Sequence, residues 1–180
     1  MRSKSCWWRA RGWTAALPKL AHLIAAAAVA TLAVPAGAQM QPASAESLGT
    51  AVGTCLSAVE SDGTIVSALE ARGWSRARID NGGEAADEIM LFGMAGNEAL
   101  ILTSEAGEDG RAPCIVLARL PRTSAYHPTA EALSQIIGMP TERNENQYFW
   151  RFSDKIAQMT PSGSAEAPSL RFVVMQSGDN

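Results

Sequence analysis

The chain has 180 residues, 47% of them hydrophobic, and a formal net charge of −3 at pH 7. All 18 acidic residues lie at or beyond Glu46, whereas five of the 15 basic residues precede residue 39, so residues 39–180 carry a net charge of −8. This acidic balance excludes a nucleic-acid-binding protein and a protein held on anionic membranes by its charge, because both of those surfaces repel carboxylates.

The first part of the chain has the pattern of a signal peptide. The segment Met1–Lys19 is basic and contains no acidic residue, and the apolar stretch Leu20–Val34 follows it. A retained membrane anchor is the alternative, but a spanning helix needs roughly 20 apolar residues and this run is shorter. We therefore expect a protein of the periplasm or a secreted protein, without a membrane anchor.

Two positions after the apolar stretch fit signal peptidase, which accepts small residues before the cleaved bond. Ala36-Gly37-Ala38 is the first and Ala43-Ser44-Ala45 is the second. Cleavage after Ala38 is the prediction, with cleavage after Ala45 as the alternative. Residues 1–38 are then a cleaved signal peptide, residues 39–45 a disordered lead-in, and residues 46–180 a single α+β domain.

The domain is expected to begin with two helices. Apolar residues from Leu48 to Val59 recur at helical spacing, which predicts a helix from about Glu46 to Ser61. A second, shorter helix runs through Val66 and Leu69, with Gly73 as its stop. Trp74 follows this stop directly, where its ring can fold back onto the two helices.

Three short apolar runs bounded by turn residues come next: Ile89–Met94, Ala99–Ser104 and Cys114–Leu120. The first link contains Gly96-Asn97 and the second contains Asp109-Gly110, both of which are typical of turns between antiparallel strands. These runs predict a meander of three strands.

The last third of the domain is expected to hold one helix and two or three strands. Thr129 can cap a helix that ends at Gly138, and strands follow at Tyr148–Phe152 and Leu170–Gln176, with Ile156–Thr160 as an additional strand. The element order ααβββαββ predicts an α+β fold, with an antiparallel sheet of about five strands and helices packed mainly on one face.

Cys55 and Cys114 are the cysteines that remain after removal of the signal peptide, and an oxidising compartment pairs them. The expected disulfide joins the first helix to the third strand. A redox or metal site is the alternative, but the spacing is not C-x-x-C and His127 is the one histidine beyond the leader. We expect no metal and no cofactor.

Candidates for catalysis are sparse. Histidine is the side chain that most often acts as a general base near neutral pH, so His127 is the weak candidate for this role, although no partner motif for it is visible. Acidic residues gather at residues 84–88, at residues 105–109 and at Glu142 with Glu145, and paired carboxylates can hydrolyse glycosides. The oxygen-rich segment 105–110 lacks the alternating ligands of a calcium loop.

The segment 147–152 carries large aromatic side chains on both faces of a predicted strand. Tyr148 and Trp150 share one face, whereas Phe149 and Arg151 share the other. If the helices cover one side of the sheet, the opposite side presents aromatic rings beside arginines, which is typical of protein-binding surfaces. The candidate binding face consists of Tyr148, Phe149, Trp150, Arg151, Arg119 and Arg171. The alternative is that the rings complete the core.

These patterns favour a non-enzymatic periplasmic binding or accessory protein that contacts a protein partner in the cell envelope. A small periplasmic hydrolase that uses His127 or an acidic pair is one alternative. A structural component of the cell envelope is the other.

Overall fold

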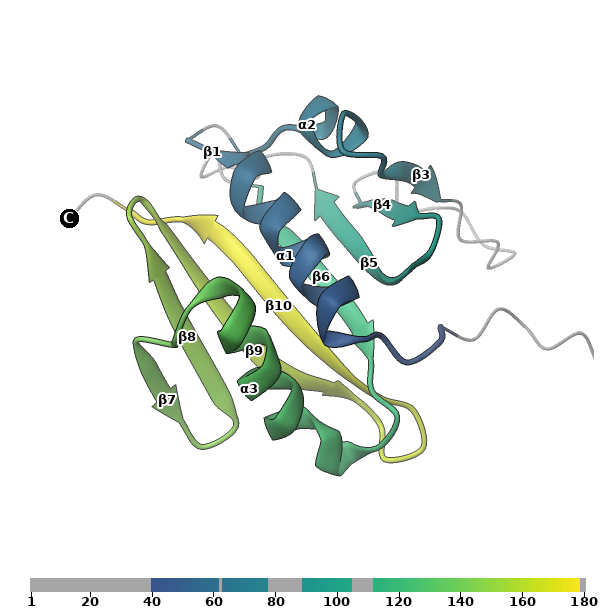
Figure 1. The fold of residues 1–180 in the computed structure, drawn as a ribbon. Coiled ribbons are helices and arrows are strands. Elements are labelled where there is room, and N and C mark those ends of the chain that lie inside the picture. Colours follow the sequence, from purple (N-terminus) through teal and green to yellow (C-terminus); the bar gives the residue numbers. More distant parts are fainter. Residues whose placement is uncertain (1–39, 62, 78–88, 105–111, 179–180) are drawn as a thin grey trace, which may run out of the picture. The chain divides into compact units, whose positions relative to one another are not determined.

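Among the described residues, eight strands form an antiparallel sheet in the order β3-β4-β5-β6-β10-β9-β8-β7 (Figure 1). A separate small sheet pairs β1 with β2. The computed structural model describes residues 40–61, 63–77, 89–104 and 112–178, so the predicted signal peptide lies outside the described residues. The strands are β1 (Val59–Glu60), β2 (Gly63–Thr64), β3 (Ser75–Ala77), β4 (Ile89–Met94), β5 (Asn97–Ser104), β6 (Cys114–Arg119), β7 (Glu142–Asn144), β8 (Gln147–Phe152), β9 (Lys155–Gly163) and β10 (Pro168–Gln176).

Both long helices lie on one face of the sheet, next to each other (Figure 1). In the described part of the chain the helices are α1 (Ala45–Ala58), α2 (Val66–Glu70) and α3 (Tyr126–Ile137), and the 3-10 turn η1 (Thr123–Ala125) leads into α3. α1 contacts β5, β6 and β10 near the middle of the sheet. The predicted α+β class with an antiparallel sheet is therefore confirmed.

The topology repeats itself. Each half has a long helix followed by a meander of four strands: α1 precedes β3 to β6, and α3 precedes β7 to β10. The halves join where β6 pairs with β10, with Val116 opposite Phe172. Because an antiparallel pair has a local twofold axis, the two halves are related by a pseudo-twofold axis through this pair of strands.

A buried row of side chains follows this symmetry across six strands. Its residues, in sheet order, are Phe92, Ile101, Val116, Phe172, Met159 and Tyr148, each opposite the next in the strand register. All six are 3% exposed or less. The helices supply the other half of the core, since Leu48 and Val52 of α1 and Leu133 of α3 are also fully buried. The core therefore lies between the two helices and one face of the sheet.

The predicted disulfide between Cys55 and Cys114 is present. It joins α1 to the start of β6, which is the third strand of the predicted meander, and the two Cα atoms are 5.5 Å apart. This separation is within the roughly 4.4–6.8 Å that disulfides span. The bond therefore fastens the first helix to the centre of the sheet.

Trp74 packs as the sequence predicts. Gly73 ends the turn after α2 with φ of +87°, a conformation that glycine adopts without strain. The Trp74 ring is 1% exposed, and its Nε1 donates a hydrogen bond of 3.2 Å to Oγ1 of Thr54 on α1. The indole therefore ties the segment after α2 back to α1.

The predicted number of about five strands is wrong, since the main sheet has eight strands in the described ranges alone. The additional segment Ile156–Thr160 is a full strand, β9. Sequence patterning missed β3 and β7, which are the edge strands and have three residues each. Such short strands lie mostly in solvent and need no apolar alternation, so they leave no periodic signal.

Three predicted boundaries also need correction. The first helix ends at Ala58, because Val59 begins β1. α3 begins at Tyr126, before the predicted cap Thr129, and Pro128 lies in the first turn, where a missing N–H breaks no helical hydrogen bond. The lead-in is ordered over its last residues, since Pro42 pairs with Arg119 of β6 and the Ser44 side chain accepts a hydrogen bond from N–H of Ser47 as the cap of α1.

Candidate binding face

The sheet has one face under the helices and a second face that no described helix covers (Figure 1). We call the second one the open face. Alternation along each strand assigns its residues. They are Ser75, Ala77, Ile89, Leu91, Leu100, Leu102, Ser104, Ile115, Leu117, Arg119, Glu142, Asn144, Gln147, Phe149, Arg151, Ile156, Gln158, Thr160, Ser162, Ser169, Arg171, Val173 and Met175.

Tyr148 and Trp150 do not belong to the open face, so this part of the predicted binding face is wrong. They point to the helix side, where their side chains are 3% and 2% exposed. The Trp150 Nε1 donates a hydrogen bond of 2.8 Å to the backbone oxygen of Gly138 after α3. Both rings stack in the core, with Trp150 also packed against Phe172. For these two residues the alternative, completion of the core, holds.

The other four predicted residues lie on the open face. Phe149 and Arg151 come from β8, Arg119 from β6 and Arg171 from β10. Arg151 and Arg171 are exposed, whereas Phe149 and Arg119 are partly buried by their neighbours. The strand register separates them, because Arg171 faces Leu117 and Thr160, while Arg151 faces Ile156.

A row of mostly apolar side chains crosses the open face. From β4 to β8 the register places Leu91, Leu102, Ile115, Val173, Gln158 and Phe149 opposite one another, and we call this set the apolar row. Gln158 is its one polar member. Five gaps of ~4.8 Å between neighbouring strands make the row about 24 Å wide. All six residues keep part of their surface in solvent.

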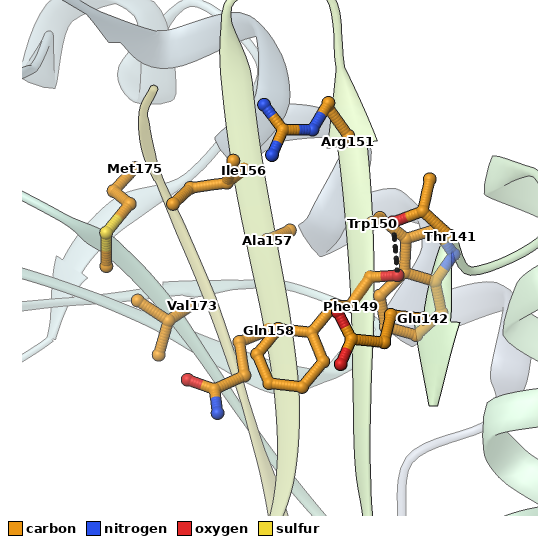
Figure 2. Close-up of a pocket in the computed structure, with 10 residues that line it drawn as sticks. All are labelled: Thr141, Glu142, Phe149, Trp150, Arg151, Ile156, Ala157, Gln158, Val173 and Met175. Carbon is orange, nitrogen blue, oxygen red and sulfur yellow. Dashed lines mark hydrogen bonds between the residues drawn. The ribbon is translucent and has the colours of Figure 1, made fainter. Parts of the chain in front are cut away.

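The row ends at a hollow on β8, β9 and β10 (Figure 2). Its volume is about 230 Å³. The apolar side chains of Phe149, Ile156, Val173 and Met175 line it, together with the polar side chains of Thr141, Glu142, Arg151 and Gln158. Met175 is 37% exposed, which is high for a large apolar side chain. The hollow can therefore receive an apolar group beside a guanidinium and a carboxylate.

Two backbone contacts position the rim of the hollow. The Oγ1 of Thr141 donates a hydrogen bond of 3.2 Å to the backbone oxygen of Phe149 (Figure 2). The N–H of Thr141 donates to the same oxygen at 2.8 Å. This pairing continues the register in which Glu142 of β7 faces Phe149 of β8. Patterning missed Glu142 as a rim residue because β7 is too short to be recognised.

His127 lies away from these side chains, on α3. Its Nδ1 is 2.8 Å from the hydroxyl oxygen of Tyr148 and 3.5 Å from a guanidinium nitrogen of Arg143. The Arg143 guanidinium also lies 5.1 Å from the centre of the Tyr148 ring. Within the described residues, the hydrogen-bond contacts of His127 thus include neither a serine nor a carboxylate.

The structure describes only some of the acidic residues that the sequence offers as candidates. The groups at residues 84–88 and 105–109 lie outside the described residues, so the calcium-like segment does too. Glu142 lies on β7, and Glu145 lies in the β7–β8 turn with φ of +46°.

In the described part of the chain, no group of three or more metal-ligating side chains could hold a metal ion. No helix of that part is long and apolar enough to span a membrane.

Comparison with known proteins supplies no relative. No family model matches the chain, and neither a curated protein nor a solved structure matches it significantly. The function of the chain is therefore inferred from the geometry of the open face.

Proposed function

We propose that this chain is a non-enzymatic binding or accessory protein that is exported and contacts a protein partner through its open face. The observation that carries the proposal is the apolar row. It lies on the open face of the sheet, whereas the hydrophobic core lies on the face under the helices. The row extends about 24 Å across the strands, and strands of five residues extend about 17 Å, so the piece of sheet that contains the row, polar side chains included, is on the order of 400 Å². Apolar side chains gathered on an exposed surface with polar residues around them often mark an interaction site.

The environment of His127 favours binding over hydrolysis. A general base needs a nucleophile or substrate proton within hydrogen-bond reach, and its ring needs an orienting partner. The polar contacts of the His127 ring are with Tyr148 and Arg143, the Tyr126 ring packs against it edge-on, and a guanidinium cannot accept a proton. Tyr148 is itself buried under α3, so this pair is better explained as an anchor between α3 and β8.

Export is part of the proposal. The disulfide and the absence of a spanning helix from the described residues fit a secreted or periplasmic protein. Cleavage after Ala38 keeps Ser44 as the cap of α1 and keeps Pro42 paired with Arg119. Cleavage after Ala45 removes both contacts, which supports Ala38 as the site.

The proposal is tested by changing the apolar row without touching the core. We expect the double variant Leu102→Gln and Val173→Gln to fold, because both side chains reach solvent, and to lose at least tenfold in the amount of partner captured from the cell envelope after reversible cross-linking. Met139→Gln is the matched control, since Met139 is 73% exposed and lies outside the open face.

Folding of each variant is verified by its urea unfolding curve and by the intact disulfide. If the folded double variant keeps every partner that the wild type and Met139→Gln capture, the open face is not the binding surface.

A further inference from the structure

Among the described residues, the open face carries more basic than acidic side chains, although the protein is acidic. These charged side chains are Arg119, Arg151, Arg171 and Glu142. The carboxylate of Glu98, near the β4–β5 turn, instead accepts a hydrogen bond from Ser47 of α1. Residues 39–180 contain ten basic and 18 acidic residues, so the rest of the domain is strongly negative. Opposite potentials across an interface steer association and select the partner. A surface of this kind therefore favours a partner that carries carboxylates.

The hollow beside Arg151 is small. Ligand pockets of small molecules and cofactors are usually roughly 300–1,000 Å³, and this hollow holds about 230 Å³. A single apolar side chain of a larger partner fits such a volume better than a complete small-molecule ligand. Pockets that receive one anchoring side chain are typical of the centres of protein interfaces.

Arg151 is placed to contact the partner residue next to that anchoring side chain. It is exposed on β8 and faces Ile156, whose side chain lines the hollow (Figure 2). A guanidinium binds a carboxylate through two parallel hydrogen bonds, which fixes the orientation as well as the charge of the partner. Arg171 offers a second guanidinium farther along the face, beyond Val173 on β10.

We propose that the open face binds an acidic and apolar polypeptide segment of another protein. An apolar side chain of the segment enters the hollow between Phe149 and Met175, and flanking carboxylates bind Arg151 and Arg171. This inference rests on the proposed function, since it names the partner chemistry of the same surface. A second copy of this chain is a poorer partner, because two open faces packed together bring arginines against arginines.

The test uses three fluorescent peptides and the purified, disulfide-bonded protein. The first peptide alternates leucine and glutamate around a central phenylalanine. The second carries lysine in place of each glutamate, and the third carries serine in place of each apolar residue. We expect fluorescence anisotropy to show at least tenfold tighter binding of the first peptide than of the other two, with a preference over the second that decreases as salt is added.

Variants then locate the binding. Arg151→Glu is expected to weaken binding of the acidic, apolar peptide at least tenfold, and Arg151→Gln by a smaller factor. Arg122→Glu, an exposed arginine before η1, changes the net charge equally and is expected to alter the affinity less than twofold. Equal losses for Arg151→Glu and Arg122→Glu would mean that net charge alone drives binding, and would overturn the proposal.

Three further results would overturn it. The first is equal affinity for the acidic and the basic peptide, and the second is no measurable binding of the acidic one. The third is a dimer of the wild type in sedimentation that Arg151→Glu dissociates, which would make a second copy the occupant. The capture experiment with Leu102→Gln and Val173→Gln tests the binding surface separately. If this double variant loses the captured partner but the acidic, apolar peptide does not bind, then the open face is the binding surface and only the proposed partner chemistry is wrong.

Discussion

At the scale of single residues, Tyr126 illustrates how one side chain connects several elements. It begins α3, and its hydroxyl lies 2.7 Å from the backbone oxygen of Asn146 in the β7–β8 turn and 3.0 Å from that of Met159 in β9. The side chain is buried, and this burial raises the pKa of Tyr126 well above its usual range. The neutral hydroxyl is therefore the form that the folded protein favours.

The raised pKa of Tyr126 predicts a loss of stability in alkali. A group whose pKa is higher in the folded state contributes its full stability below the unfolded pKa, here about 10, and loses that contribution as the pH rises further. Tyr126→Phe removes the hydrogen bonds and should lower the free energy of unfolding by about 1–2 kcal/mol at pH 8.

Urea unfolding curves between pH 8 and 11.5 check this prediction. Above pH 10 the wild type should lose stability more steeply than Tyr126→Phe, so the difference between them shrinks. Parallel pH profiles would contradict the assignment of the alkaline loss to Tyr126.

Residue patterns also account for the error at Tyr148 and Trp150. The alternation along residues 147–152 correctly separates the side chains into two sets, because a strand sends neighbours to opposite faces. Both sets contain an aromatic ring, so the pattern does not say which set the helices cover. The packing of α3 decides this, and it places Tyr148 and Trp150 inside and Phe149 and Arg151 outside.

At the scale of elements, the hairpin turns have different tolerances for a side chain. Gly96 in the β4–β5 turn and Gly163 at the end of β9 both have positive φ, of +77° and +78°. A Cβ on Gly96 would meet no atom within 4 Å, whereas a Cβ on Gly163 would collide with the backbone oxygen of Ala167 and with Ser169. The two turns therefore share a backbone conformation and differ in space.

This difference predicts unequal effects of alanine. Gly96→Ala should cost about 1–2 kcal/mol of stability, the penalty of the left-handed conformation alone. Gly163→Ala should cost at least ~1 kcal/mol more, because the strands β9 and β10 must also shift to make room. Urea unfolding of both variants gives the comparison, and equal losses would show that the β9–β10 turn rearranges freely.

Elements with strong periodicity were predicted well. The run 89–94 matches β4 in full, the run 99–104 matches most of β5, and the run 114–120 contains all of β6 and one residue more. These strands lie in the interior of the sheet, where one face is buried and alternation is enforced by the core. The missed strands β3 and β7 lie at the edges and have little to bury, so local sequence carries no signal for them.

At the scale of the whole molecule, the disulfide closes a long loop across the first half of the fold. Cys55 and Cys114 are separated by 59 positions, and both side chains are fully buried. Closing a loop of this length restricts the unfolded chain and stabilises the native state by up to ~4 kcal/mol in the loop-entropy description. The bond also connects α1 with β6, the strand through which the two halves meet.

The variant in which both cysteines become alanine should therefore unfold at markedly lower urea. We expect a loss of about 2–4 kcal/mol in the free energy of unfolding, with a larger dependence on urea because the unfolded state is more expanded. A loss below ~1 kcal/mol would show that packing of α1 alone holds the helix on the sheet.

The sequence by itself determined the α+β class, the pairing of Cys55 with Cys114, the interior strands and the return of Trp74 onto α1, because each of these follows from local spacing or from elimination. The pairing of β6 with β10, the pseudo-twofold relation of the halves and the side of the sheet that stays open were decided only in the tertiary structure. The physical reason is that alternation along a strand separates its side chains into two sets, which follows from the local sequence. Which set is buried depends on a helix that is far away in the sequence and packs on one face of the sheet.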